Sequence, residues 1–355
     1  MILEMTKQKI KSSARRGMAW IYHASRHSLK HLKGKALILA YHRVLSEKEL
    51  TGDYFIQPGM YVRNDVFEQQ MQFLAERFQI VSLLELLDHW AHGTWDRGKR
   101  YCVITFDDGW RDNYIYAYPI LRKYNIPATI FLPTDFVGTN QWFWPDRMGY
   151  LLRHYYGSRE RQWTMKSAKS SFLNGRSWAR DLIRQTGNGN IDSAIEMCKE
   201  RSEEEIDKFI DEMSRAMDLK FPDERLFLSW REVEEMSQHG ISFGSHSCTH
   251  QILPKLSTEK IRNEIERSLD TLKEKKINYV PVFAYPNGDY NQEIIKHAKA
   301  AGYRAAVSME SGFEGRSPKD RFRLKRVGIH NDISATIPLF TFHISGLVQL
   351  LSPAL

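Results

Sequence analysis

Short apolar segments alternate with helical patterns along most of this chain, and this alternation limits its fold more than any other feature. Apolar runs of this length are typical of strands buried on both faces of a sheet. Strands separated by helices indicate βα units around a largely parallel sheet. The predicted strands are residues 36–40, 102–106, 128–132, 241–243, 280–284 and 305–307.

Helices between these strands are marked by apolar spacing and by residues typical of helix ends. Ser229 and Glu232 form a capping-box pattern at the start of one helix, and Gly302 follows the last periodic residue of another. The predicted helices are residues 65–77, 83–91, 229–240, 257–276 and 291–301.

Residues 140–226 interrupt this alternation. The region is rich in Trp, Arg and Glu and is predicted to be a mostly helical insertion. Trp144 lies in its aromatic opening segment, which either lines a groove or anchors the insertion to the βα domain. We therefore expect a domain over residues 36–330 that contains the insertion, with flanking segments 1–35 and 331–355.

The net charge of +8 belongs to one end of the chain. Residues 1–35 contain nine Lys and Arg and a single Glu, which leaves 42 basic and 42 acidic residues in the remainder. A balanced body argues against a surface that coats nucleic acid, so no nucleic-acid partner is expected. Met18, Ile21 and Tyr22 fall near helical spacing in this basic segment. Such a segment either lies on an anionic membrane surface, or is a solvated helical arm or a helix packed on the domain.

Both ends of the chain also bear on its location. Near residue 1, no apolar run of the length found in secretory signals precedes a cleavage pattern. Three cysteines are too few for a disulfide framework and fit a reducing compartment. The segment 331–355 has no Asp, Glu, Lys or Arg after Asp332, but Pro338 and Gly346 interrupt it, which argues against a spanning helix. A buried closing helix is favoured over an interfacial one. We expect a cytoplasmic protein, peripheral on the inner face of the membrane.

Two adjacent carboxylates, Asp107 and Asp108, follow the predicted strand 102–106. Burying charged groups there is costly unless something uses them, and in α/β folds the carboxyl ends of strands face the site. Gly109 allows a sharp turn after them. The alternative is an Asx-type turn that caps the next helix.

Two histidines, His246 and His250, follow the predicted strand 241–243. Histidines four residues apart can direct two imidazoles toward one metal ion. Together with Asp108 they would form a three-ligand site with open positions, which is typical of catalytic rather than structural zinc. Cys248 is not expected to be a ligand, because a closed four-ligand site leaves no position for water.

Two further motifs lie near the end of the predicted domain. The turn at residues 285–288 follows a predicted strand, and its backbone N–H groups near Asn287 could stabilise an oxyanion. A plain strand-to-helix turn is the alternative. His330 follows a short β-like run, and its role depends on the other motifs.

Taken in this order, these motifs resemble the polysaccharide deacetylase family, the NodB-homology group of carbohydrate esterases. The carboxylate pair is similar to the family's first motif and the histidine pair to its second. Residues 285–288 resemble a variant of its third motif, and residues 329–330 its last. Residues 39–44 are similar to the start of bacterial exopolysaccharide-type members.

The resemblance implies a fold and a set of roles. The fold would be a distorted (β/α)7 barrel of the deacetylase type. The metal ligands would be Asp108, His246 and His250. Asp107 would be the general base, and His330 the general acid that protonates the leaving amine.

The resemblance also implies residues around the metal. Tyr41 and His42 would lie at the rim of the site, and Tyr285 and Asn287 would bind substrate or the oxyanion. In the family an Asp or Arg orients the acid histidine. The candidates here are Asp320, Arg323 and Arg326.

The expected function is therefore a metal-dependent hydrolase that removes N-acetyl groups from amino sugars of a polysaccharide or lipid-linked glycan. Zinc is the expected ion, although cobalt, nickel or manganese could substitute. One alternative is the release of formyl or another small acyl group from a lipid-linked sugar. A second is an inactive glycan-binding or assembly protein.

Overall fold

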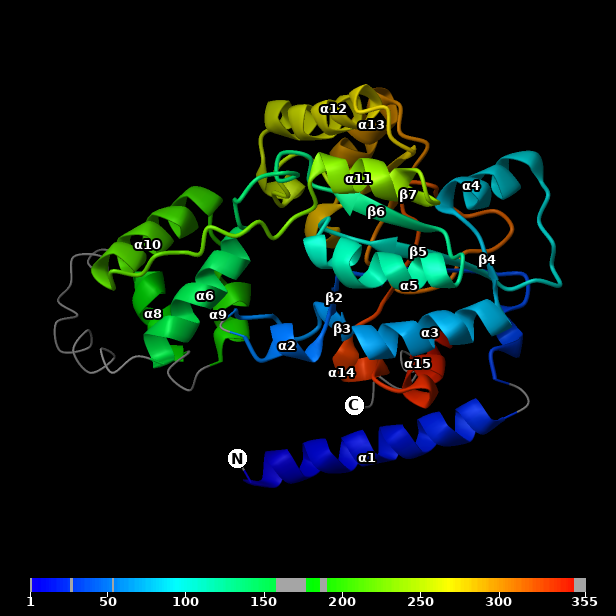
Figure 1. The fold of residues 1–355 in the computed structure, drawn as a ribbon, viewed down its shortest axis with the longest axis horizontal. Helices are drawn as coiled ribbons and strands as arrows, with labels where there is room; N and C mark the ends of the chain where they lie inside the picture. Colours follow the sequence, from blue (N-terminus) through cyan, green and yellow to red (C-terminus); the bar gives the residue numbers. More distant parts are fainter. Residues whose placement is uncertain (1, 26–27, 53, 158–176, 186–189, 348–355) are drawn as a thin grey trace. The chain divides into compact units, whose positions relative to one another are not determined.

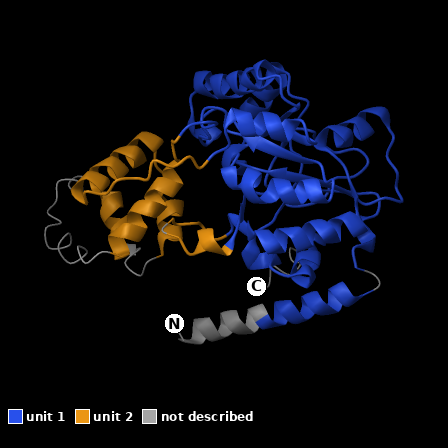
Figure 2. Ribbon diagram, in the orientation of Figure 1, with its two compact units in different colours: residues 1–46, 59–139, 227–355 blue, residues 47–58, 140–226 orange. Residues whose placement is uncertain are grey.

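A computed structural model of the chain describes residues 2–25, 28–52, 54–157, 177–185 and 190–347. The chain divides into two compact units (Figure 2). The first unit contains residues 1–46, 59–139 and 227–355, and the second contains residues 47–58 and 140–226.

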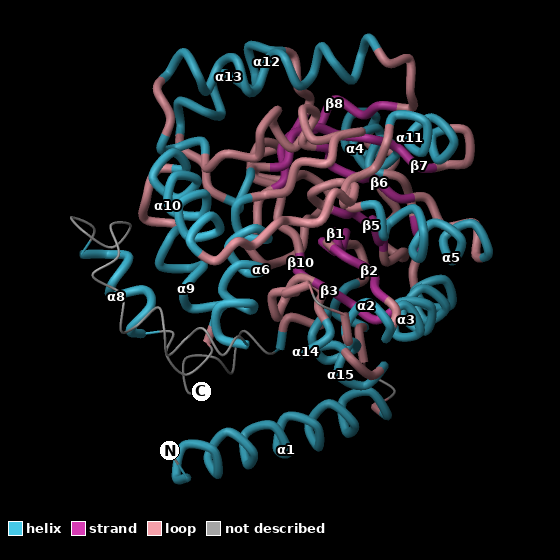
Figure 3. Tube along the Cα trace, turned by 60° about the vertical axis from the view of Figure 1, so that its left-hand side comes forward, coloured by secondary structure: helices cyan, strands magenta, loops and turns pink. Residues whose placement is uncertain are grey.

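The first unit is built around a parallel sheet of eight strands, visible in Figure 1 and from a second side in Figure 3. The strand order is β10-β1-β5-β6-β7-β8-β9, and the short strand β4 pairs with β5. The strands are β1 (Ala36–Tyr41), β4 (Gln79–Ile80), β5 (Tyr101–Phe106), β6 (Ala128–Leu132), β7 (Ile241–Ser245), β8 (Tyr279–Ala284), β9 (Ala305–Val307) and β10 (Val327–Gly328). A separate parallel pair is formed by β2 (Arg43–Leu45) and β3 (Tyr61–Arg63).

Helices surround the sheet and bury its strands. Every residue of β1, β5, β6 and β7 is buried, which explains why these strands appear in the sequence as continuous apolar runs. In Figure 1, α12 and α13 lie on one side of the strands, and α3, α14 and α15 on the other. The helices of this unit are α1 (Ile2–Ala24), α3 (Asn64–Arg77), α4 (Leu83–His92), α5 (Tyr118–Lys123), α11 (Trp230–Ser237), α12 (Thr258–Glu274), α13 (Gln292–Ala301), α14 (Asn331–Ser334) and α15 (Ile337–Ile344).

The six predicted strands and five predicted helices are confirmed, with differences only at their ends. The predicted cap of α11 is present, because the Ser229 side chain accepts from the Glu232 N–H and the Glu232 carboxylate accepts from the Ser229 N–H. The sequence did not reveal β4 and β10, since two-residue strands carry no periodicity.

The second unit is helical and has its own apolar core. Its helices are α2 (Glu47–Leu50), α6 (Trp144–Gly157), α8 (Ser177–Gln185), α9 (Ile191–Cys198) and α10 (Glu203–Ala216). The segment 47–58 joins this unit because Phe55 lies against α6 at Gly149, where a Cβ atom would be 2.5 Å from the Phe55 ring. Residues 158–176 and 186–189 of the predicted insertion lie outside the described residues.

The flanking segments belong to the first unit. Helix α15 buries Phe340, Phe342 and Ile344 and so forms the expected closing helix, while residues 348–355 of that apolar segment lie outside the described residues. Of the helices in the described part of the chain, none is long and apolar enough to cross a membrane.

Candidate active site

The two carboxylates lie on a constrained turn at the carboxyl end of β5. Asp107 and Asp108 are only 2% and 3% exposed. Asp108 has φ +72° and Gly109 has φ +64°. A Cβ atom on Gly109 would lie 2.7 Å from Leu132 Cδ2, and the positive φ adds backbone strain for other residues, so glycine is favoured at this position. The turn thus places two buried carboxylates at the carboxyl end of β5, the end of a strand at which α/β folds place their sites.

Asp108 lies between the two predicted histidines. Its Oδ1 atom is 3.3 Å from His246 Nε2 and 3.2 Å from His250 Nε2, and the three potential ligand atoms lie within 4.8 Å of one another. The Trp110 indole N–H donates to Asp108 Oδ2 at 2.9 Å. This hydrogen bond fixes the carboxylate plane and leaves Oδ1 facing both imidazoles.

The histidine orientation suits a metal ligand. His246 Nδ1 lies 2.8 Å from the carbonyl oxygen of Ala284. A carbonyl only accepts hydrogen bonds, so Nδ1 carries a proton, and Nε2 is the atom directed at Asp108 and available as a ligand once it is deprotonated. The cluster therefore presents one carboxylate oxygen and two imidazole nitrogens, the donor set of a catalytic zinc site with open positions.

Electrostatics of the cluster favour the ligand forms of two of its members. Burial alone would raise the pKa of Asp108, but hydrogen bonds from His246 and His250 hold it well below its usual value. Burial lowers the pKa of His250, so this imidazole is readily neutral. Burial would also lower the pKa of His246, but the adjacent Asp108 raises it. A metal ion at His246 Nε2 would therefore compete with a proton for this nitrogen.

The loop that carries the histidines is held by a buried glutamate on α12. Glu264 Oε2 accepts from the backbone N–H groups of Cys248 at 2.8 Å and Thr249 at 2.9 Å. Its Oε1 atom accepts from the Thr249 hydroxyl at 2.9 Å. Glu264 is 6% exposed, so its carboxylate is buried against the loop that it binds. Ser247 and His250 in this loop have positive φ. No local pattern in the sequence indicates this role of Glu264.

Cys248 lies in this loop but turns away from the cluster. Its Sγ atom is 3.5 Å from the carbonyl oxygen of Glu264, and burial raises the pKa of the thiol to about 12. The expectation that Cys248 is not a ligand agrees with this orientation.

Asp107 lies beside the cluster and is held by an arginine. Arg326 forms two hydrogen bonds with it, from Nη1 to Oδ1 and from Nη2 to Oδ2, both 2.7 Å long. Burial would raise the pKa of Asp107, but the Arg326 guanidinium outweighs this effect and holds it below its usual value. Asp107 is therefore an ionised carboxylate that is not part of the metal cluster.

His330 contacts Asp332 and not one of the predicted partners Asp320, Arg323 and Arg326. Its Nδ1 atom lies 3.2 Å from Asp332 Oδ2, and the same oxygen accepts from the Gly59 N–H at 3.0 Å. Arg326 instead holds Asp107, and Arg323 pairs with Glu310. The expectation that one of the candidates orients His330 is wrong for Arg326 and Arg323, because their guanidinium groups are engaged elsewhere.

Asp320, the third candidate, accepts from the backbone N–H of Phe322 at 2.9 Å. Its carboxylate therefore supports its own loop. The residue in contact with His330 is Asp332. In the sequence Asp332 stands out only because it is the last Asp, Glu, Lys or Arg before the apolar C-terminal segment.

A model of the polysaccharide deacetylase family matches residues 95–306, which is more than half of the chain. The chain belongs to the polysaccharide deacetylase family. Thus the resemblance seen in the motifs is confirmed at the family level.

Two curated relatives illustrate the range of similarity. The putative polysaccharide deacetylase YxkH of Bacillus subtilis is 24% identical over 236 residues, covering 66% of this chain and 54% of the relative. The poly-beta-1,6-N-acetyl-D-glucosamine N-deacetylase of Staphylococcus epidermidis is 35% identical over 118 residues, covering 31% of this chain and 40% of the relative. The matches thus span about half or less of these relatives.

Solved structures share the fold over most of the chain. The Streptococcus pyogenes deacetylase PplD has a TM-score of 0.54 and 21% identity, covering 89% of this chain and 97% of that one. IcaB from Ammonifex degensii has a TM-score of 0.54 and 17% identity, covering 87% of this chain and 97% of that one. The predicted fold, a barrel of the deacetylase type, is confirmed.

Two aromatic residues expected from the deacetylase motifs do not reach the site. Tyr41 is fully buried, and its hydroxyl donates to Gln70 at 3.0 Å. Tyr285 is 1% exposed, and its hydroxyl donates to the Phe322 carbonyl at 3.0 Å. Both expectations are corrected: each side chain points into the core, since neighbouring positions along an extended chain face opposite ways.

Other predicted residues have different environments. His42 lies near the site, since its imidazole is close enough to lower the pKa of Asp107, Asp108 and His330. Asn287 is exposed at φ +57° in the turn after β8, the neighbour of β7. Trp144 packs against the core of the second unit.

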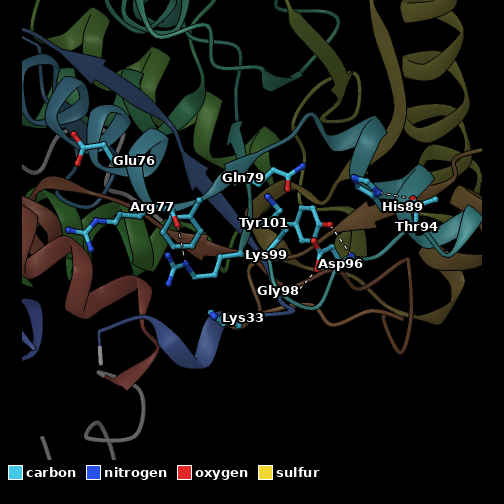
Figure 4. A pocket seen from close by; sticks show the side chains of 12 residues that line it. Lys33, Glu76, Arg77, Gln79, His89, Thr94, Asp96, Gly98, Lys99 and Tyr101 are labelled. Carbon is cyan, nitrogen blue, oxygen red and sulfur yellow. Dashed lines mark hydrogen bonds between the residues drawn. The ribbon is translucent and has the colours of Figure 1, made fainter. Parts of the chain in front are cut away.

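A hollow also lies at the opposite end of the sheet. It has a volume of about 630 Å³ and lies at the start of β4 and β5. Figure 4 labels Gln79, Lys99 and Tyr101 among the residues that line it. Its lining includes no member of the Asp108, His246 and His250 cluster. The candidate site of this deacetylase is therefore at the carboxyl ends of the strands, as in other barrels.

Proposed function

We propose that this chain is a metal-dependent hydrolase that removes N-acetyl groups from amino sugars of a glycan. The observation that carries the proposal is the position of Asp107, an ionised carboxylate held beside the Asp108, His246 and His250 cluster. A base next to a three-ligand cation site is the arrangement that amide hydrolysis by water requires.

Asp108, His246 and His250 would hold the cation. Two imidazoles and one carboxylate favour zinc, and cobalt, nickel or manganese could occupy the same ligands. When bound, such an ion supplies Lewis acidity toward water and the amide carbonyl.

Asp107 would take the proton from the attacking water. Each of its oxygens accepts one hydrogen bond from Arg326 and retains a second lone pair, so the pair with Arg326 orients the base without blocking it. Since Arg326 keeps the carboxylate ionised, the base is available at neutral pH.

His330 would donate a proton to the leaving amine. The side chain of His330 is 26% exposed, and its Nδ1 atom contacts Asp332, which leaves Nε2 as the atom that faces substrate. The turn at Asn287 is our candidate for stabilising the negative oxygen of the tetrahedral intermediate.

N-acetylated polymers are the first substrates to test. The Staphylococcus epidermidis relative is named a poly-beta-1,6-N-acetyl-D-glucosamine N-deacetylase, so β-1,6-linked N-acetylglucosamine oligomers and a lipid-linked N-acetylglucosamine are suitable probes. The experiment is an assay of acetate and formate release by the zinc-, cobalt-, nickel- and manganese-loaded protein, with a chelator as control.

Acetate release that the chelator abolishes is the expected result. Formate release without acetate would assign the alternative acyl group. Binding of the oligomer without release of either acid by any metal form would replace the hydrolase with the glycan-binding alternative.

We also propose that the protein acts at the inner face of a membrane. The support is that the whole charge excess of the chain lies in residues 1–35, where it would attract anionic lipid. This location would suit a lipid-linked glycan as substrate.

A further inference from the structure

Helix α1 has one face that packs against the rest of its unit. Ala19 is fully buried, the Tyr22 ring lies 6.0 Å from the Phe342 ring, and His23 Nδ1 is 3.0 Å from the Thr341 hydroxyl. These contacts place α1 alongside α15, as Figures 1 and 3 show. The helix is therefore a seated part of the deacetylase unit and presents a fixed outer face.

That outer face is apolar. Trp20 is 64% exposed, Ile21 is 76% exposed and Met18 is 38% exposed. Among the described residues only two other large apolar side chains are exposed, Ile115 and Met309. Three of these five side chains thus lie within four consecutive positions of one helix. Clustered exposed apolar side chains of this kind commonly mark an interaction surface.

The segment of the chain that carries this face is basic. Residues 1–35 carry nine Lys and Arg against one Glu, while the rest of the chain has balanced charge. An apolar face with an exposed Trp inside a strongly cationic segment is the pattern of a helix that lies in a membrane interface. A second protein copy would bring the same +8 segment toward this one, so like charges oppose self-association through α1.

We propose that the outer face of α1, formed by Trp20 and Ile21 with Met18 at its edge, lies on an anionic lipid surface. The proposal rests on the membrane location proposed above and specifies how it is achieved. Trp20 and Ile21 enter the headgroup region, while the Lys and Arg of residues 1–35 attract anionic lipids. The helix lies in the plane of the surface, since no described helix is long and apolar enough to cross a membrane.

The opposite face of α1 links this surface to the candidate acid. Arg15 Nη2 donates to the Ile333 carbonyl at 3.2 Å, and Ile333 lies in α14, the helix that begins directly after His330. A membrane-bound α1 would therefore hold the segment of His330 at a defined place relative to the lipid surface, where a lipid-linked sugar would be found.

The test is vesicle flotation of the full chain. Vesicles of phosphatidylcholine alone are compared with vesicles that contain about one-third phosphatidylglycerol, an anionic lipid. The test variant is Trp20→Ser with Ile21→Ser, and the matched control is Ile115→Ser, which removes an exposed apolar side chain that lies outside α1. Each protein is also assayed on a water-soluble N-acetylglucosamine oligomer and sized in solution without lipid.

The wild-type protein and Ile115→Ser are expected to float with anionic vesicles only, and the double variant is expected to bind roughly tenfold or more weakly. Activity on the soluble oligomer should be the same for all three, so failure of the hydrolase proposal is recognised separately by absent activity in every protein. Equal flotation of the double variant overturns the anchor. A wild-type dimer that the double variant converts to a monomer overturns it in favour of a second copy.

Discussion

Arg326 and Asp107 are joined by two parallel hydrogen bonds of 2.7 Å, and both side chains are shielded from solvent. The two residues are 219 positions apart in the sequence. Asp107 directly follows β5, and Arg326 directly precedes β10. A buried carboxylate without such a partner would favour its protonated form. The pair therefore keeps Asp107 charged beside the Asp108, His246 and His250 cluster, as the proposed role of general base needs.

Asp107→Asn should bind zinc and lose turnover. The amide cannot accept a proton, and removal of a general base costs roughly 10²- to 10⁴-fold in rate. Zinc content and acetate release are measured on the same preparation. Asp108→Asn is the comparison and should lose zinc as well as activity. Activity near the wild-type level in Asp107→Asn would remove this residue from the role of base.

Arg326→Met should shift the pH dependence of activity. Without the guanidinium, burial raises the pKa of Asp107, so the acidic limb of kcat/KM moves to higher pH. The uncompensated buried charge also destabilises the fold by about 3–5 kcal/mol. Arg326→Lys retains a charge and tests the pH profile if the Met variant does not fold. Arg323→Met, which alters an exposed pair with Glu310, should leave the profile unchanged.

Asp332→Asn should move the basic limb of the profile. Burial lowers the pKa of His330, and the Asp332 carboxylate opposes this effect. Removing the Asp332 charge lowers the pKa of His330 further. His330 then loses its proton, and the enzyme its activity, at a lower pH than in the wild-type protein. The measurement is kcat/KM against pH, with Asp320→Asn as a control remote from His330 contacts. An unchanged basic limb in Asp332→Asn would mean that His330 is not the proton donor.

Glu264→Ala should weaken zinc binding without touching a ligand. It leaves the buried N–H groups of Cys248 and Thr249 without their acceptor and loosens the loop between His246 and His250. Loss of such support is expected to cost about 10- to 100-fold in metal affinity. Zinc affinity is measured by competition with a chelating dye. Glu266→Ala, an exposed glutamate on the same helix, is the control and should bind zinc normally.

The sequence by itself determined the elements and the chemistry that neighbours along the chain can reveal. Apolar runs identified the buried strands, because a strand covered on both faces has no polar positions. Gly109 after two carboxylates, and two histidines four residues apart, identified the cation cluster before its members were seen together. Those signals are local, since backbone geometry and ligand type restrict which residues can stand there.

Only the tertiary structure decided the pairings between distant segments. Arg326 could be assigned to Asp107, and Asp332 to His330, only once β5, β10 and α14 had been placed in space. The support from Glu264 on α12 is of the same kind. Tyr41 faces Gln70 instead of the site for a related reason. The direction of a side chain at a strand end, and the partner that satisfies a buried charge, depend on which strands become neighbours, and no local pattern encodes that choice.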